Sequence, residues 1–154
     1  MTELTQLNFP ENYQIRMKQS QDMVYIFCFI RKSWMVYTPE EWVRQHTIAF
    51  LHQTLKYSLS SIALEVPIHQ NGMRKRADIV VYKKEKPYIM VECKRPSVKI
   101  TQQTFDQIAR YNGIIGSDFL MVSNGLSHYY CKMDYENKRY QFLKELPSNT
   151  KANS

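Results

Sequence analysis

Two apolar stretches on either side of a charged turn, RADIVVYKKEKPYIMVECKRP at residues 76–96, constrain the fold more than any other part of the chain. Their β-branched and apolar residues predict two strands, at 76–82 and 88–94, joined as an antiparallel hairpin. Charged residues nevertheless stand at the strand ends: Asp78 in the first strand, and Glu92 and Lys94 in the second. These charges are either solvated strand ends or parts of a functional site.

The expected pairing of the two strands brings these charges together. Side chains alternate between the faces of a strand, so Glu92 and Lys94 share one face. A turn centred on Glu85 would place Asp78 directly opposite Glu92. Two carboxylates in that position repel each other and destabilise a sheet, unless a divalent cation lies between them. Oxygen ligands of this kind favour magnesium or manganese, and Lys94 could then hold a phosphate oxygen, help to deprotonate a water or stabilise developing charge.

A simpler alternative stays open, in which Asp78 is balanced by Arg76, and Glu92 by Lys94 or Arg95, as solvated strand ends. The charge distribution favours a functional site with a polyanionic partner. The chain has a net charge of +7, and nine basic residues lie between positions 74 and 99 against three acids. Clustered positive charge favours nucleic acid, through neutralisation of phosphates and release of counterions. The basic residues are Arg74, Lys75, Arg76, Lys83, Lys84, Lys86, Lys94, Arg95 and Lys99.

Two helices are expected beside this hairpin. The first covers residues 38–57, where Thr38 is the N-cap, Pro39 takes the first helical position and Glu41 completes a capping box. The second begins after Thr101 and ends near Gly116. Further strands are expected at 23–31, 33–37, 62–68, 118–124, 128–134 and 139–143, with a hairpin turn at residues 71–72.

The order of these elements predicts an α/β sandwich. Its core is helix, strand, strand, strand, helix, strand, with a β-hairpin at each end of the chain. Short turns make the first three strands antiparallel, while the helical crossover makes the third and fourth parallel, so the central sheet is mixed. The 154 residues fit one domain, at 1–146, followed by a polar and disordered tail at 147–154.

Several classes of protein are not indicated. The cysteines Cys28, Cys93 and Cys131 form no CxxC pair, and the four histidines show no ligand spacing, so neither a zinc site nor a disulfide framework is expected. No apolar run approaches the length of a membrane span, and the first residues show no signal-peptide core, so a cytoplasmic location is expected.

Two motifs in this chain resemble a known nuclease superfamily. Asp78, followed after thirteen residues by Glu92-Cys93-Lys94, resembles the PD-(D/E)xK signature, with Ala77 in place of the usual proline. Gln107 and Tyr111, four residues apart on one helical face, resemble the QxxxY motif of RecB-like and type I restriction nucleases.

The segments TPEEWVRQ, KRADIVVY, VECKRP and TFDQIARYN together resemble the N-terminal nuclease domain of type I restriction enzyme R subunits, in a short stand-alone version, over residues 7–146. The resemblance implies a restriction-endonuclease-like sandwich. It also implies that Asp78 and Glu92 bind Mg²⁺, with Mn²⁺ as a substitute, and that Lys94 is catalytic. It further implicates Gln107 and Tyr111 in orienting the site or the DNA backbone, and an acid on the first helix, Glu40 or Glu41, with Glu65 as a weaker candidate. Arg76 and Arg95, from the basic cluster, are candidates for the same nucleic-acid-binding or orienting role.

One departure from that family is clear. The full-length R subunit carries a helicase motor after this domain, whereas the present sequence has no GxxxxGK[ST] loop. DNA is an expected partner from the basic cluster and the resemblance. Other restriction-modification or helicase proteins are expected partners as well. The leading hypothesis is a magnesium-dependent DNA nuclease. The alternatives are a non-cleaving DNA-binding module that acts with a partner, and a domain whose charged strand ends are structural only.

Overall fold

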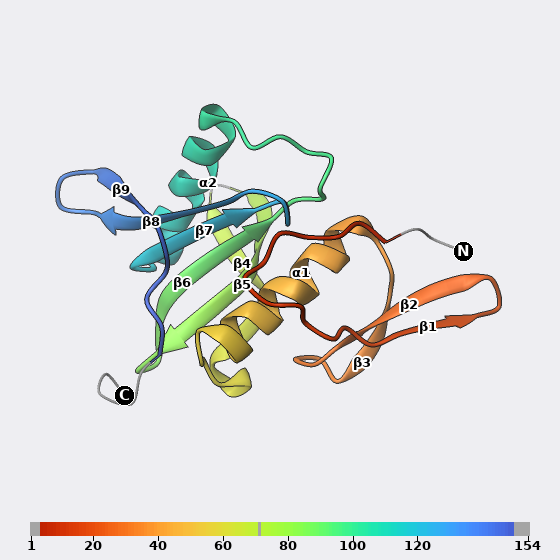
Figure 1. The fold of residues 1–154 in the computed structure, drawn as a ribbon. Helices are drawn as coiled ribbons and strands as arrows, with labels where there is room; N and C mark the ends of the chain where they lie inside the picture. The colour runs from red at the N-terminus through yellow and green to blue at the C-terminus, as the bar shows by residue number, and fades with distance from the viewer. Residues whose placement is uncertain (1–3, 71, 150–154) are drawn as a thin grey trace.

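The computed structural model describes residues 4–70 and 72–149 and contains two β-sheets (Figure 1). An antiparallel sheet of three strands lies near the N-terminus, in the order β1-β2-β3, and a sheet of six strands follows in the order β4-β5-β6-β7-β8-β9. The smaller sheet comprises β1 (Met17–Ser20), β2 (Met23–Cys28) and β3 (Ser33–Val36). The larger comprises β4 (Ile62–Gln70), β5 (Met73–Lys83), β6 (Lys86–Cys93), β7 (Phe119–Ser123), β8 (His128–Asp134) and β9 (Arg139–Leu143).

The two main helices cover opposite faces of the larger sheet. Helix α1 (Pro39–Ala49) packs on one face with Ile79, Val81, Ile89 and Val91. Helix α2 (Gln102–Ile115) packs on the other with a second set of strand residues: Val80, Met90, Leu120 and Val122. Strands β6 and β7 are parallel and every other pair in this sheet is antiparallel. The predicted α/β sandwich with a central mixed sheet is therefore confirmed.

Three details differ from the sequence prediction. The N-terminal hairpin gains the additional strand β1, and the C-terminal hairpin, predicted only as an addition to the core, extends the central sheet through β8. The first helix is shorter than expected, since α1 ends at Ala49 and continues as the π-helical turn η1 (Phe50–Thr54), before the 3₁₀ turn η2 (Leu59–Ser61). No helix among the described residues is long and apolar enough to cross a membrane.

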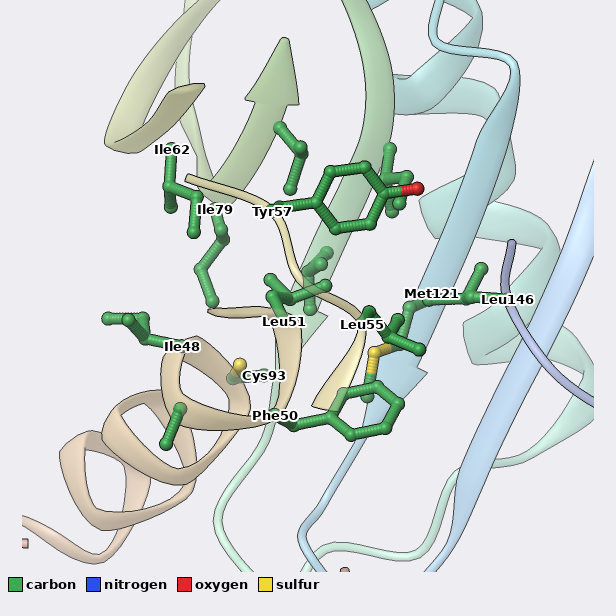
Figure 2. Packing of buried hydrophobic residues seen from close by; sticks show 14 of the residues in the cluster. Ile48, Phe50, Leu51, Leu55, Tyr57, Ile62, Ile79, Cys93, Met121 and Leu146 are labelled. Atoms are coloured by element: carbon green, nitrogen blue, oxygen red, sulfur yellow. The ribbon is translucent and has the colours of Figure 1, made fainter. Parts of the chain in front are cut away.

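The core on the α1 side explains why the chain continues helically beyond Ala49. Ile48, Leu51 and Leu55 all point toward the sheet, where Ile79 and Met121 complete the cluster (Figure 2). Ile48 and Leu51 are almost fully buried, and burial of an aliphatic side chain of this size stabilises a fold by about 1.5–3 kcal/mol. The apolar stripe therefore continues from α1 through η1 on the side that faces the sheet.

Both chain ends of the predicted domain make specific contacts. Asn8 donates its backbone N–H to the carbonyl of Gly125 over 2.8 Å. Of the predicted tail at 147–154, residues 147–149 are described: Tyr57 donates its hydroxyl to the Pro147 carbonyl over 2.6 Å, and Asn149 donates its N–H to the Leu55 carbonyl over 2.7 Å. Residues 150–154 of that tail, and Asn71 of the predicted turn, lie outside the described residues.

The hairpin of β5 and β6 keeps the expected register over its centre, though its turn is different. Ile79, Val80 and Val81 pair with Val91, Met90 and Ile89. The turn itself is two residues, Lys84 and Glu85, both with positive φ, and an irregularity after Val81 pairs Tyr82 with Pro87 instead of Tyr88. A tight turn plus one extra residue thus gives the same central register as the wider turn that the sequence suggested.

The end of α2 provides a stability test with opposite signs at two glycines. Gly116 caps the helix in the left-handed region at φ 80, whereas Gly113 lies inside the helix, and a Cβ at either position meets nothing within 4 Å. We expect Gly116→Ala to lower the free energy of unfolding by about 1 kcal/mol because of backbone strain. Gly113→Ala should raise it by about 0.5–1 kcal/mol. Urea denaturation of both variants measures these free energies of unfolding. Changes of the same sign in the two variants would contradict the assignment of the helix C-terminus to Gly116.

Candidate functional site

The site begins where β5 and β6 separate. Their described pairing runs from the turn to Ile79 and Val91, one residue short of Asp78. Beyond that point the Asp78 carboxylate accepts a hydrogen bond from the backbone N–H of Cys93, with Oδ2 at 2.7 Å from the nitrogen. The described ladder therefore does not include the predicted pair of Asp78 with Glu92, although the charge of Glu92 is close enough to raise the pKa of Asp78.

A break in β4 accompanies this separation. Glu65 has a φ of 51, and it lies between two regular pairs, Leu64 with Ile79 and Val66 with Ala77. Leu64 packs against the core under α1 and Val66 against the core under α2, although residues two apart in a regular strand share a face. The strand therefore turns over at Glu65, beside Asp78, and both carboxylates become accessible to one cation from α1.

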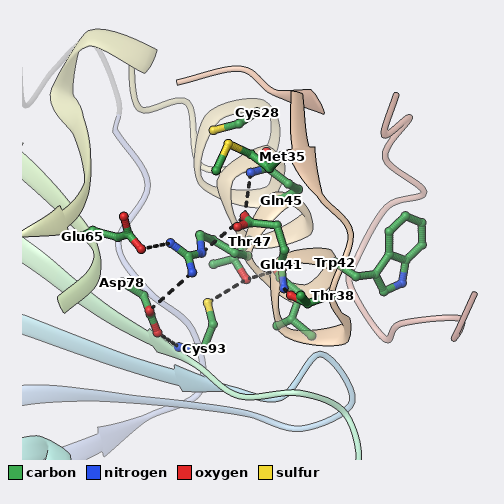
Figure 3. Close-up of polar contacts among 12 residues, drawn as sticks. Cys28, Met35, Thr38, Glu41, Trp42, Gln45, Thr47, Glu65, Asp78 and Cys93 are labelled. Carbon is green, nitrogen blue, oxygen red and sulfur yellow. Dashed lines mark hydrogen bonds and ion pairs between the residues drawn. The ribbon is translucent and has the colours of Figure 1, made fainter. Parts of the chain in front are cut away.

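That cation is Arg44, which is buried on the inner face of α1. Its Nε lies 3.4 Å from Glu41 Oε2, its Nη1 3.6 Å from Glu65 Oε1 and its Nη2 3.9 Å from Asp78 Oδ1. Figure 3 shows the three acids converging on this point from the helix and the sheet. Gln45 donates to Glu41 over 3.0 Å, and Arg31, after β2, pairs with Glu65 over 2.8 Å. One guanidinium thus links α1 to both strands.

Glu92 lies in a second cluster of charges. Its Oε1 is 3.4 Å from Lys75 Nζ and 3.7 Å from Lys94 Nζ, so the expected proximity of Glu92 and Lys94 is present. Its Oε2 is buried and has no hydrogen-bond partner among the described residues. Lys75 Nζ also lies 4.8 Å from the centre of the Tyr111 ring, which connects α2 to this carboxylate.

The pKa values of both carboxylates are raised. Burial raises the pKa of Asp78, the negative charge of Glu92 raises it further, and the Cys93 amide and Arg44 only partly oppose these effects. Burial likewise raises the pKa of Glu92, against the opposing charges of Lys75 and Lys94. Deprotonated Asp78 and Glu92 therefore lack full compensation from the protein alone, and perturbation of this kind is typical of functional sites.

The two candidate acids on the first helix, Glu40 and Glu41, have different surroundings. Glu40 is exposed, yet its charge raises the pKa of both Asp78 and Glu92, so it lies close enough to act on the pair. Glu41 is buried and its carboxylate goes to Arg44 and Gln45. The predicted N-cap is confirmed by the bond from the Glu41 N–H to Thr38 Oγ1, whereas the Glu41 side chain does not complete the capping box.

The remaining predicted residues lie around this centre at different distances. Tyr111 is half-buried beside Lys75, while Gln107, one helical turn earlier, is exposed. Arg76 and Arg95 are also exposed. The basic cluster divides between the two ends of the hairpin, because Lys83, Lys84 and Lys86 belong to the turn, opposite the end that carries Asp78. The remaining members lie at the start of β5 or after the end of β6, and Lys75 and Lys94 among them contact Glu92: Arg74, Lys75, Arg76, Lys94, Arg95 and Lys99.

Sequence reasoning missed two participants, Arg44 and Lys75. Arg44 precedes Ile48 and Leu51 by four and seven residues, so it falls on the apolar stripe of α1 and could have been identified as a charge that requires buried partners. Lys75 had no such signal, because it was one of several basic residues in a row. Its contact with Glu92 depends on how β5 and β6 separate.

The donor atoms suit a small divalent cation in part. Within residues 4–70 and 72–149, no group of three or more His, Cys, Asp or Glu side chains is placed to hold a metal ion. Two carboxylates with raised pKa values and an unpartnered buried oxygen, Glu92 Oε2, nevertheless match magnesium, which is commonly held by one or two carboxylates with waters and substrate phosphates. The described residues therefore fit Mg²⁺ with an incomplete protein ligand set.

Comparison with known proteins identifies a family. The family model described as type I restriction enzyme R protein N terminus matches residues 39–147, which include α1, the whole six-stranded sheet and α2. No curated protein and no solved structure matches the chain significantly. The match begins after β3, so the three-stranded sheet lies outside it.

Proposed function

Since the chain belongs to the family of type I restriction enzyme R protein N-terminal domains, we propose that it is a magnesium-dependent DNA nuclease domain that hydrolyses phosphodiester bonds. One observation supports this most strongly. A half-buried carboxylate, Asp78, and a buried one, Glu92, both have raised pKa values at the separated ends of β5 and β6, the charge of Glu92 adds to the shift of Asp78, and Lys94 lies beside Glu92. We propose a PD-(D/E)xK site composed of these three residues.

Each residue has a role that follows from its contacts. Asp78 is fixed by the Cys93 amide through Oδ2, which leaves Oδ1 directed toward the site, where Arg44 is 3.9 Å away. Glu92 offers Oε2, while Lys75 and Lys94 hold Oε1. Lys94 is partly exposed, so its ammonium can hold a phosphate oxygen or stabilise the charge that develops on it. A bound Mg²⁺ would supply Lewis-acid polarisation of the phosphate.

The surrounding charges suit a DNA backbone. Arg76 and Arg95 are exposed near the strand ends and can neutralise phosphates. The ring of Tyr111 makes a cation–π contact with Lys75. We propose that this contact positions Lys75 and thereby Glu92. Gln107, exposed on the preceding turn of α2, is proposed to contact the DNA backbone. Other restriction-modification or helicase proteins are proposed as partners that deliver DNA.

Binding of a divalent metal tests the site before any substrate is known. We expect Mn²⁺, titrated by calorimetry, to bind the wild-type chain at one site and to lose at least about tenfold in affinity with Asp78→Asn, because a neutral amide replaces one of two anionic ligands. Asp134→Asn, in the distant β8–β9 hairpin beside Arg139, is the matched control and should leave binding unchanged. Equal binding by wild type and Asp78→Asn would exclude Asp78 as a ligand.

A non-cleaving DNA-binding module is the second candidate function. Arg44 favours it, because a buried guanidinium already lies beside Asp78 and gives it part of the compensation that a metal would give. Such a module would bind DNA in a salt-sensitive way without turnover. Failure to cleave plasmid, linear or single-stranded DNA with Mg²⁺ or Mn²⁺, together with retained DNA binding, would support it.

A further inference from the structure

The three-stranded sheet carries basic and aromatic side chains together on one face. Paired residues of an antiparallel sheet share a face, and so do residues two apart. The pairs Lys18 with Tyr25, Tyr25 with Val36, and Phe27 with Trp34 therefore place these side chains on one surface. Arg16 joins them through its backbone bond to Phe27. We call this surface, Arg16, Lys18, Tyr25, Phe27 and Trp34, the aromatic platform.

The opposite face of the same sheet holds it to the protein. Ile26 and Cys28 are fully buried there, and Met35 lies near Gln45 of α1 (Figure 3). The rings of the aromatic platform, in contrast, belong to neither of the two core clusters found among the described residues. In Figure 1 the sheet extends away from the six-stranded sheet, on the far side of α1. The rings of Tyr25, Phe27 and Trp34 are half-buried while Arg16 and Lys18 are exposed, so the aromatic platform borders solvent.

The cations lie directly over the rings. The Arg16 guanidinium is 4.5 Å from the Phe27 ring centre and 5.3 Å from that of Trp34. Lys18 Nζ is 4.5 Å from the Trp34 ring and 5.7 Å from the Tyr25 ring. Both cations are exposed, so they can turn to a solvent-borne anion and leave ring faces for another flat group. Cations beside ring faces are the two features that unpaired nucleic acid needs, for its phosphates and its bases.

The charge of the surrounding chain suits the same ligand. Residues 16–36 contain four basic side chains, Arg16, Lys18, Arg31 and Lys32, against the one acid Asp22 in the β1–β2 turn. Arg31 also pairs with Glu65, which contacts Arg44 and through it the site at Asp78. One end of the sheet is thus tied to the break in β4 beside the candidate nuclease site.

We propose that the aromatic platform binds an unpaired strand of nucleic acid, with bases stacked on Phe27 and Trp34 and phosphates held by Arg16 and Lys18. Double-stranded DNA cannot use the rings in this way, because its bases are already stacked and paired. The proposal does not require the nuclease site to be active, since it depends on residues outside the region that matches the family.

Binding in EDTA tests the proposal separately from cleavage. Fluorescence anisotropy of the full chain should show tighter binding of labelled oligo(dT) or oligo(U) than of a duplex of equal length, and the two single strands distinguish DNA from RNA. Phe27→Leu with Trp34→Leu keeps apolar packing but removes the rings, and should weaken binding of the preferred single strand at least fivefold with little change in its salt dependence. Arg16→Gln with Lys18→Gln should instead reduce the slope of log K against log salt by about 1.4, or roughly 0.7 per cation.

One control variant and one fluorescence variant make the outcome decisive. Lys132→Gln with Arg139→Gln removes two cations from the distant β8–β9 hairpin and should leave single-strand binding unchanged. The chain has two tryptophans, so Trp42→Phe leaves Trp34 alone to report stacking through quenching of its fluorescence by oligo(dT). Wild-type affinity in both platform variants, preference for the duplex, or an unquenched Trp34 in the presence of saturating oligonucleotide would overturn the proposal. If the wild-type chain binds the single strand but does not cleave DNA with Mg²⁺, that result would count against the nuclease proposal alone.

Discussion

Replacing Lys94 with alanine should reduce Mg²⁺-dependent DNA cleavage on the order of 10²–10³-fold, the usual loss when one group that stabilises developing charge is removed. The reason is its position: Lys94 Nζ lies 3.7 Å from Glu92 Oε1 and is partly exposed, so it can reach both the carboxylate and a phosphate. The measurement is the initial rate of plasmid or linear DNA cleavage at saturating Mg²⁺, for wild type and variant purified in parallel.

The fold should tolerate this change. Lys75 also pairs with Glu92 Oε1, so Lys94→Ala leaves one cation at that carboxylate, and loss of a partly exposed pair costs at most about 1 kcal/mol. Lys99→Ala, which removes an exposed basic residue farther along the chain, is the matched control and should cut nearly as well as wild type. Thermal melting of all three proteins separates loss of chemistry from loss of folding.

Two outcomes would contradict the assigned role. Full cleavage by Lys94→Ala would remove Lys94 from the site. Cleavage that is lost equally in Lys94→Ala and Lys99→Ala would indicate that both lysines only attract DNA, because an electrostatic effect falls on neighbouring cations alike. That second pattern would favour the DNA-binding module over the nuclease.

The central register of the hairpin could be predicted because it depends on apolar residues alone. Val80 and Met90 must face the core under α2 while Ile79 and Val91 face the core under α1, and a slip by one residue would reverse both sets. The order of helices and strands followed from equally local signals, such as the caps at Thr38 and Thr101. These features were confirmed because burial and capping act over a few residues.

The site itself was predictable only as a set of residues, not as an arrangement. Nothing in residues 76–96 reveals that the ladder stops at Ile79, because the cause lies in β4, where Glu65 adopts a positive φ, and in α1, which supplies Arg44. The proximity of Glu92 and Lys94 followed from alternation along one strand, and the structure has it. The relation of Asp78 to Glu92 depended on three separate elements, and the predicted cross-strand pair is not part of the described ladder.

Replacing Arg44 with alanine should be the most destabilising single change at the site. The side chain is buried and contacts Glu41, Glu65 and Asp78, and the opposing acids outweigh the effect of burial and leave its pKa raised. Removing one partner of a buried ion pair costs about 3–5 kcal/mol, since an uncompensated charge stays behind. Urea denaturation should therefore show a loss of that size for Arg44→Ala.

A matched pair of variants identifies the cause of that loss. Arg31→Ala removes the other cation from Glu65, whose side chain is 41% exposed, and should cost at most about 1 kcal/mol. Arg44→Met with Glu41→Gln fills the space and removes a buried charge, so much of the stability should return. A loss in Arg44→Ala no larger than in Arg31→Ala would mean that the guanidinium does not compensate the buried acids.

The same variant also tests how Arg44 and a divalent metal share Asp78. Without the guanidinium, 3.9 Å away in the wild type, Asp78 and Glu41 have a greater need for a cation. Added Mn²⁺ should then raise the melting temperature of Arg44→Ala more than that of wild type, because a ligand that binds the folded state stabilises it by an amount that grows with the logarithm of its affinity. An equal rise in both proteins would show that Arg44 and the metal act at Asp78 independently. A larger rise in the variant would show that, in the metal-free protein, the guanidinium supplies part of the positive charge that the metal supplies to Asp78 when it binds.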